Sequence, residues 1–212
     1  MFAPDLAYDS GAYVLLLGSG NRERPRNYTS TVQDYFFMLR DKPEDSTWLT
    51  SETGTCGAAA LCLGSLTPIL TSADPSAADL ANKKGWYLGM RSTEQVVTAA
   101  IIILGNVTFS THEPARPQAG TCSSNLGTAR VYNISYLNAA AEQGAPRARP
   151  LPTSIGLPPS PVGGMVTLDD GALVPFCIGC SPDSPLESVQ PTMPPGSVPP
   201  SPKSRVYWYI QR

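Results

Sequence analysis

The 212-residue sequence predicts an all-β fold of short antiparallel sheets with long loops and one short helix. Its apolar runs are mostly of strand length and are bounded by Gly, Pro, Asn, Asp or Ser. The 18 Gly and 22 Pro make up about a fifth of the chain and follow no collagen-like period. No window reaches the roughly 18 uninterrupted apolar residues of a membrane span. We therefore expect a globular chain rich in turns.

Nine runs have the strand pattern. They are Tyr13–Leu17, Tyr35–Leu39, Trp86–Leu88, Val96–Leu104, Val107–Thr111, Ala129–Tyr136, Met165–Leu168, Ala172–Phe176 and Val206–Ile210. Tight hairpin turns are predicted at Gly105-Asn106 and at Asp169-Asp170-Gly171. Neighbouring strands should therefore pair antiparallel.

One surface helix is predicted from Pro75 to about Lys84, with Asp74 as its N-cap and Gly85 just past its end. Two stretches, residues 146–161 and 182–202, hold 6 and 8 prolines and few large apolar residues. They are predicted to be extended, polyproline-like loops outside the core. Since a strand pattern follows the second stretch, that stretch should be an internal connection.

Two units of the strand pattern can be aligned, and a third begins after them. The units are Tyr13–Leu17 with Tyr35–Asp41, Val97–Leu104 with Arg130–Tyr136, and Met165–Phe176. Radial repetition of such sheets gives a β-propeller. We predict that residues 1–212 form the C-terminal part of one propeller, with two to three blades, and that the partner blades lie in an N-terminal remainder of the protein. A β-sandwich is the alternative, although it explains the repeated unit less well.

The charges argue against several functions. The 15 basic and 17 acidic residues are interspersed, so no cluster can neutralise successive phosphates, which excludes nucleic-acid binding. The single histidine, His112, has no nucleophile elbow near it and is predicted to be a loop residue. Asp169 and Asp170 suit a turn better than an acid–base pair. We expect no catalytic, cofactor-binding or metal-binding residues.

Three other motifs have ordinary structural explanations. Gly18-Ser19-Gly20 lacks the Lys and the helix of a phosphate loop, and is expected to be a bend against a crowded neighbour. The alternating Arg22, Arg24 and Arg26 are expected to face water rather than to form ion pairs. Glycosylation-type sequons begin at Asn27, Asn106 and Asn133, and the sequence alone does not decide whether these residues are glycosylated.

Five cysteines bear on the cellular compartment. Cys56 and Cys62, and Cys177 and Cys180, are closely spaced in turn-like sequence, while Cys122 stands alone. Such spacing favours small-loop disulfides in an oxidising compartment, with zinc ligation and free thiols as the alternatives. The start of the chain lacks the regions of a secretory signal. The sequence thus indicates either an internal protein or a fragment of a longer exported one, and the cysteines favour export.

Several segments resemble the C-terminal β-propeller of the PilC/PilY family of type IV pilus tip proteins. They are Val14–Pro25, which includes Gly-Ser-Gly-Asn-Arg-Glu-Arg-Pro, then Tyr35–Asp41, Lys84–Leu88 with its Gly-Trp-Tyr-Leu, Glu94–Thr98 and the terminal Arg205–Tyr209. The resemblance covers roughly residues 5–137 and 163–212. It implies an exported adhesin and pilus-biogenesis factor, with a signal peptide and a large region N-terminal to this one, and with minor pilins as partners.

The sequence also departs from that family. Members may carry an Asp-rich calcium loop in the propeller, but no Asp-x-Asp-x-Asp pattern occurs here, so calcium cannot be carried over as a cofactor. No Arg-Gly-Asp tripeptide is present either, so an integrin-type contact cannot be claimed.

The expected function is a non-enzymatic, extracellular module of a pilus tip, acting in adhesion and pilus biogenesis. A structural subunit or docking module of an extracellular filament is the alternative. A quinoprotein-like propeller enzyme is disfavoured, because the carboxylates are sparse. Recognition should lie in the long connections Thr111–Gly127 and Pro182–Pro202, since loops on a rigid scaffold carry most binding surfaces.

We predict that Cys177 and Cys180 form a disulfide around the turn-forming Ile178-Gly179. A thiol reagent applied under denaturing, non-reducing conditions should leave both residues unmodified. Quantitative labelling of both would show that the disulfide is absent.

Overall fold

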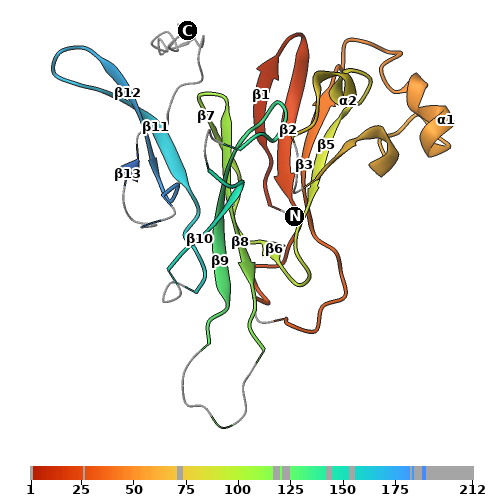
Figure 1. Ribbon diagram of the computed structural model, residues 1–212. Coiled ribbons are helices and arrows are strands. Elements are labelled where there is room, and N and C mark those ends of the chain that lie inside the picture. The colour runs from red at the N-terminus through yellow and green to blue at the C-terminus, as the bar shows by residue number, and fades with distance from the viewer. Residues whose placement is uncertain are drawn as a thin grey trace, which may run out of the picture.

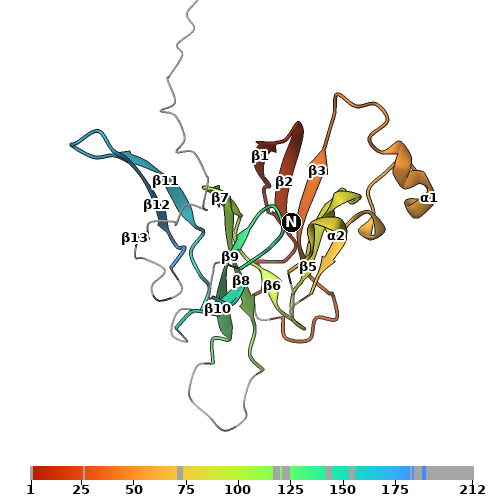
Figure 2. The ribbon, with the colours of Figure 1, turned by 45° about the horizontal axis from the view of Figure 1, so that its top comes forward.

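A computed structural model describes residues 2–25, 27–70, 74–116, 120, 125–141, 145–152, 156–181, 183 and 188–189. Within these residues the chain forms three sheets that follow one another along the sequence and stand side by side (Figures 1 and 2). This succession of mainly antiparallel sheets is the arrangement of blades in a β-propeller. The prediction of an all-β chain with two to three blades is confirmed.

The first sheet has the strand order β1-β2-β3-β5-β4. Its strands are β1 (Asp5–Asp9), β2 (Ala12–Gly18), β3 (Tyr35–Asp41), β4 (Thr67–Ile69) and β5 (Gly85–Gly89). All pairs are antiparallel except β4 with β5, which is parallel. Sequence analysis found β2, β3 and β5, but missed the two edge strands, which have few or no large apolar residues in succession.

The second sheet has the order β10-β9-β8-β6, and β7 also pairs with β8. Its strands are β6 (Gln95–Val96), β7 (Ile101–Ile103), β8 (Asn106–Glu113), β9 (Thr128–Ser135) and β10 (Ala148–Pro150).

The prediction of one continuous strand over Val96–Leu104 is wrong. Between the pairs Val96–Thr111 and Ile101–Thr108, β8 advances by three residues while the facing chain advances by five. The extra residues form a bulge. At this point the Thr98 hydroxyl, and not a backbone carbonyl, accepts the Ser110 N–H at 2.8 Å.

The first predicted hairpin turn is shifted by one residue. Its two central residues are Leu104 and Gly105, with φ of 49° and 88°, and Asn106 already pairs with Ile103. Positive φ at both central positions is typical of the type I′ turn, which matches the twist of the strands that it joins.

The third sheet contains β11 (Val162–Thr167), β12 (Leu173–Ile178) and β13 (Ser188–Val189), all paired antiparallel. The predicted turn at Asp169–Gly171 is confirmed: Gly171 has φ of 82°, and its N–H donates to the Leu168 carbonyl at 2.9 Å. The predicted strand Val206–Ile210 lies outside the described residues.

The helices are short. They are the 3-10 turns Thr50–Glu52 and Leu63–Ser65, and the α-helices α1 (Thr53–Cys56) and α2 (Ala77–Ala81). The predicted surface helix is confirmed as α2, but its N-cap is Ser76 and not Asp74. The Ser76 hydroxyl accepts the Asp79 N–H, and the Asp79 carboxylate accepts the Ser76 N–H, which is a capping box. Asp74 instead forms an ion pair with Arg147.

The first Pro-rich stretch, residues 146–161, is not wholly a loop. It contains β10, which pairs with β9, and Leu151, which is buried against Ala129 and Val131. The second stretch, residues 182–202, lies outside the described residues apart from Asp183 and β13.

The main core lies between the first and second sheets. Phe36 of β3 stacks on Phe109 of β8 with ring centroids 3.8 Å apart, and Phe109 stacks on Tyr132 of β9 at 4.7 Å. Trp86 of β5 is fully buried, and its indole N–H donates at 3.0 Å to the carbonyl of Tyr136, in the turn directly after β9. Aromatic contacts therefore join the two sheets face to face.

The opposite side of the first sheet is also apolar; we call it the outer face. From the strand register and the alternation with buried residues, it consists of Leu6, Tyr8, Tyr13, Leu15, Leu17, Tyr35, Phe37, Leu39 and Tyr87. A sheet with one solvated side normally alternates apolar and polar residues. This one instead has the composition of a sheet that is buried on both faces. At its edge Tyr8 is 67% and Tyr13 40% exposed.

We predict that the isolated chain associates through the outer face, since burying it removes apolar surface from water. Wild-type protein should sediment as larger species with rising concentration. The cross-strand pair Tyr8 and Tyr13, replaced as Tyr8→Lys with Tyr13→Glu, should remain monomeric and folded.

Val32→Lys is the matched control, because Val32 is equally exposed at 67% but lies in a loop. It should associate like the wild type. A wild-type chain that stays monomeric at every concentration would contradict the prediction and favour a self-contained sandwich.

Candidate interaction surface

Two segments of the family resemblance, the Gly18-Ser19-Gly20 bend and Glu94–Thr98, lie against each other at the junction of the first and second sheets. The Ser19 carbonyl accepts the Val96 N–H at 3.1 Å, so the loop after β2 pairs with β6. The Ser19 N–H donates to the Tyr35 carbonyl at 2.8 Å, and the Ser19 hydroxyl donates to Asp34 at 2.6 Å. One short bend thus connects three strands of two sheets.

Both glycines of this bend are required by close packing. A Cβ on Gly18 would lie 2.5 Å from a Val96 methyl carbon, and a Cβ on Gly20 would lie 2.0 Å from the Val96 carbonyl oxygen. This confirms the predicted bend against a crowded neighbour. The two glycines are needed because they let the first sheet pack closely on Val96.

Arg22 does not face water as predicted. Its guanidinium donates to the Val97 carbonyl at 2.6 Å and to the Pro158 carbonyl at 3.2 Å, linking the first sheet, the second sheet and the chain that leads to the third. Arg24 is exposed, as predicted, and its carbonyl accepts a hydrogen bond from Gln95. Arg26 lies outside the described residues.

Glu94 is the most buried charge in the described part of the chain, with a fully inaccessible side chain. Its carboxylate accepts hydrogen bonds from the hydroxyls of Thr111 and Tyr132, and lies 3.6 Å from Arg130. Burial, and then the Glu94 charge, raise the pKa of Tyr132 far above its ordinary value. A second ion pair joins Arg130 to Glu113 at 2.8 Å. Arg91 lies 3.8 Å from the other carboxylate oxygen of Glu94, so two guanidinium groups face the two carboxylates of the cluster.

His112 is a buried strand residue rather than the predicted loop histidine, because β8 extends to Glu113. Its Nε2 lies 2.7 Å from the Leu126 carbonyl oxygen, so this nitrogen carries the proton and donates. The contact holds the chain just before β9. Asp170 accepts the Ala172 N–H at 2.9 Å, which is the predicted turn role.

The sequons differ in accessibility. The Asn133 amide is half-buried and donates to the Cys180 carbonyl at 2.9 Å, and Asn106 is partly buried at the start of β8. Asn27 is exposed, and its amide oxygen accepts a hydrogen bond from Thr29.

The structure joins Cys56 to Cys62 and Cys177 to Cys180, while Cys122 lies outside the described residues. In the part of the chain that is described, no group of three or more His, Cys, Asp or Glu side chains is placed to hold a metal ion. The helices of that part are all too short to cross a membrane.

Of the two predicted binding loops, Pro182–Pro202 lies outside the described residues apart from Asp183 and β13. Thr111–Gly127 is described in part: Thr111–Glu113 belong to β8, and residues 114–116 and 125–127 form neither helix nor strand.

Residues 42–66, between β3 and β4, form a segment in which sequence analysis had singled out only the closely spaced Cys56 and Cys62. It projects beside the first sheet, carries α1 and contains the Cys56–Cys62 disulfide (Figure 1).

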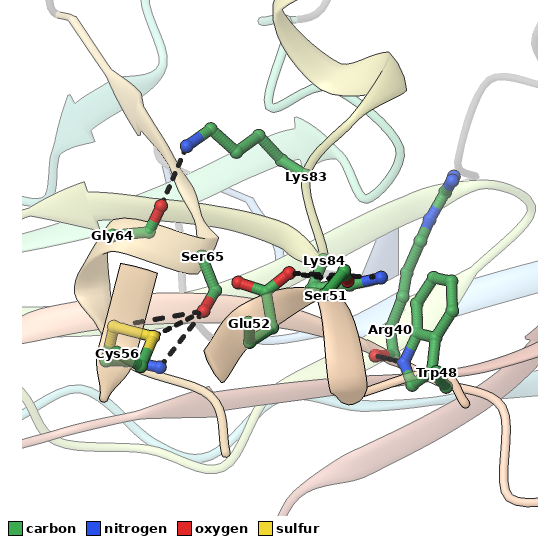
Figure 3. A network of polar contacts seen from close by, with 10 residues as sticks. Arg40, Trp48, Ser51, Glu52, Cys56, Gly64, Ser65, Lys83 and Lys84 are labelled. Carbon is green, nitrogen blue, oxygen red and sulfur yellow. Dashed lines mark hydrogen bonds and ion pairs between the residues drawn. A yellow bond between two sulfur atoms is a disulfide. The ribbon is translucent and has the colours of Figure 1, made fainter. Parts of the chain in front are cut away.

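Lys84 anchors this segment to the sheet (Figure 3). Its ammonium lies 3.6 Å from the centroid of the Trp48 ring and 3.9 Å from the Glu52 carboxylate, and all but a small part of its side chain is buried. The Trp48 indole N–H donates to the Arg40 carbonyl at 3.2 Å. The Ser65 hydroxyl contacts both sulfurs of the disulfide. The segment is thus fixed at its base and at its tip.

Two small grooves adjoin these elements. One, of about 260 Å³, lies at the inter-sheet junction between Asn21, Arg24, Asp34 and Gln95. The other, of about 310 Å³, lies beside Trp48. Both grooves are small and open to solvent.

Known proteins resemble the chain in structure and not in sequence. No known family profile matches the chain, and no curated protein matches it. The chain is similar to the crystal structure of the Pseudomonas aeruginosa PilY1 C-terminal domain, with 15% identity and a TM-score of 0.49. The match covers 82% of this chain and 42% of that one, so this chain spans less than half its length. A likeness at this level carries no conclusion about activity or partners.

We predict that Gly20→Ala lowers the free energy of unfolding by about 2–3 kcal/mol, because the added methyl forces the bend away from Val96. Chemical denaturation of the purified chain measures the loss.

Gly54→Ala is the matched control. Gly54 lies in α1 with nothing within 4 Å of an added Cβ, so this change should be neutral or slightly stabilising. Equal stability of the two variants would show that the bend is not tightly packed.

Proposed function

We propose that the chain is a non-enzymatic, extracellular module of a type IV pilus tip protein that acts in adhesion and pilus biogenesis. In this role the sheets form a rigid scaffold and the loops between them make the contacts. Minor pilins are the proposed partners, and the outer face of the first sheet is the proposed seat of a further blade. The proposal includes neither a cofactor nor a catalytic residue.

The observation that carries the proposal is the inter-sheet junction. The Gly-Ser-Gly bend and Glu94–Thr98, which carry much of the sequence resemblance to the PilC/PilY family, contact each other through backbone hydrogen bonds. Their physical role is to stack one sheet on the next. Because the resemblance lies in residues that stack the sheets, it supports a scaffold like that of the PilC/PilY propeller.

The polar cluster at this junction also favours a scaffold. Glu94 is ringed by two hydroxyls and Arg130, and Arg22 is held by two carbonyls. Buried polar groups that are held by several local partners make a rigid, specified interior. Contacts with partners are therefore expected in the loops between strands, whose sequences tolerate change better than those of the sheets.

The experiment is deletion of the coding region in the cell that produces the chain, followed by counts of surface pili and of attached cells. Both should fall, and the wild-type gene should restore them. A gene in which Pro182–Pro202 is replaced by a Gly/Ser linker of equal length should give the same amount of protein but fewer pili or weaker attachment. Proline restricts the free chain and thus reduces the entropy lost on binding.

Gold-labelled antibody on isolated filaments separates the proposal from its alternative. Label at the tip supports the pilus-tip role, whereas label along the shaft favours a structural subunit of the filament. Unchanged pili and attachment after deletion would contradict both.

A further inference from the structure

The second sheet packs against a neighbouring sheet on each of its two faces. On one face Phe109 of β8 stacks on Phe36 of the first sheet. The adjacent Thr108 points to the other face, because side chains alternate along a strand, and its hydroxyl donates to Asn133 of β9 at 2.6 Å. The Asn133 amide in turn donates to the Cys180 carbonyl, just after β12 of the third sheet. The first and third sheets therefore stand on opposite sides of the second (Figures 1 and 2).

The third sheet has one buried face and one exposed apolar face. Gly163 and its cross-strand partner Cys177, which is fully buried, face the second sheet, since a Cβ on Gly163 would lie 2.2 Å from the Ile103 side chain of β7. We call the opposite side the far face. It consists of the cross-strand pairs Val162 with Ile178, Gly164 with Phe176, and Val166 with Val174.

The far face is a continuous apolar surface. A Cβ on Gly164 would lie 3.1 Å from a ring carbon of Phe176, so this ring covers the glycine and leaves no gap between the aliphatic side chains. Val162 is 59%, Val166 46% and Ile178 40% exposed. Because a solvated sheet face normally carries polar side chains, an apolar face of this kind indicates a contact surface for protein.

The far face and the outer face of the first sheet are the two halves of one further interface of the kind already present. In both described interfaces, the side of one sheet that points forward in chain order packs on the side of the next sheet that points back. The far face points forward and the outer face points back. A second copy whose outer face lies on the far face therefore repeats this arrangement, whereas two outer faces together would join two sides that point back.

The side chains of the two faces are also compatible. Neither face contains a charged residue, so their contact leaves no ion buried without a partner. The outer face carries its most exposed tyrosines, Tyr8 and Tyr13, at the edge of the first sheet. Such rings can pack on valine and isoleucine while their hydroxyls stay in water at the rim.

We propose that copies of this chain associate head to tail, with the outer face of one copy packed on the far face of the next. The third sheet of a second copy is then the further blade that the proposed function places on the outer face, and the inference rests on that part of it. A contact between unlike faces of two copies is heterologous, so each copy offers two different surfaces.

The test uses two complementary variants of the purified chain. Val166→Lys with Val174→Glu places an opposite-charge pair on the far face, as Tyr8→Lys with Tyr13→Glu does on the outer face. In sedimentation, either variant alone should need about tenfold higher concentration than the wild type, or more, to associate. An equimolar mixture should form a 1:1 dimer at the wild-type concentration, because each variant keeps the face that the other has lost.

Val162→Lys with Ile178→Glu changes a second pair of the far face and repeats the test if the first far-face variant does not fold. Val32→Lys leaves both faces intact and should associate like the wild type. Circular dichroism and denaturant unfolding identify the variants that are folded. Far-face variants that associate like the wild type, a mixture that stays monomeric, or a wild type that is monomeric at every concentration each overturn the proposal.

This proposal and the pilus role fail separately. Head-to-tail association of the purified chain, in cells whose pili and attachment survive deletion, removes the pilus role and leaves the contact. Pili and attachment that depend on the chain, together with a mixture of variants that stays monomeric, remove the contact alone.

Discussion

The contact between the Gly18–Gly20 bend and Val96 sets the distance between the first two sheets, and the rest of the fold depends on that distance. At this separation Phe36 stacks on Phe109, and the Trp86 indole reaches the Tyr136 carbonyl just after β9. The apolar core therefore follows from a backbone approach that any side chain on Gly20 would prevent. Dispersion between closely packed rings then stabilises the pair of sheets.

The buried Glu94 cluster adds specificity rather than much net stability. Removing a carboxylate from water is expensive, and Arg130 with two hydroxyls offsets that cost only in one geometry. A shift of β6 against β8 by one residue would leave Glu94 without Thr111. The cluster thus disfavours alternative registers of two strands that are too short to define their own pairing.

The local sequence pattern was sufficient to predict the strands whose apolar runs are continuous, such as Tyr13–Leu17 and Tyr35–Leu39, and the Asp169–Gly171 turn. Prediction from local pattern failed where contacts with residues far along the chain determine the structure. The bulge after Val96 depends on Thr98 replacing a carbonyl opposite Ser110. Arg22 looked solvated because its acceptors lie far along the chain. The Trp48 groove was missed for the same reason, although a lone Trp in a polar stretch next to paired cysteines was a usable signal.

The segment that carries α1 leaves the first sheet at β3 and returns as β4, which lies parallel to β5 at the edge of that sheet. Its tip touches no strand of the other two sheets (Figure 1). Substitutions, or even a change of length, between the cysteines would therefore alter what the tip presents without disturbing the stack behind it. Such a layout allows the surface of the tip to change while the supporting sheets stay the same.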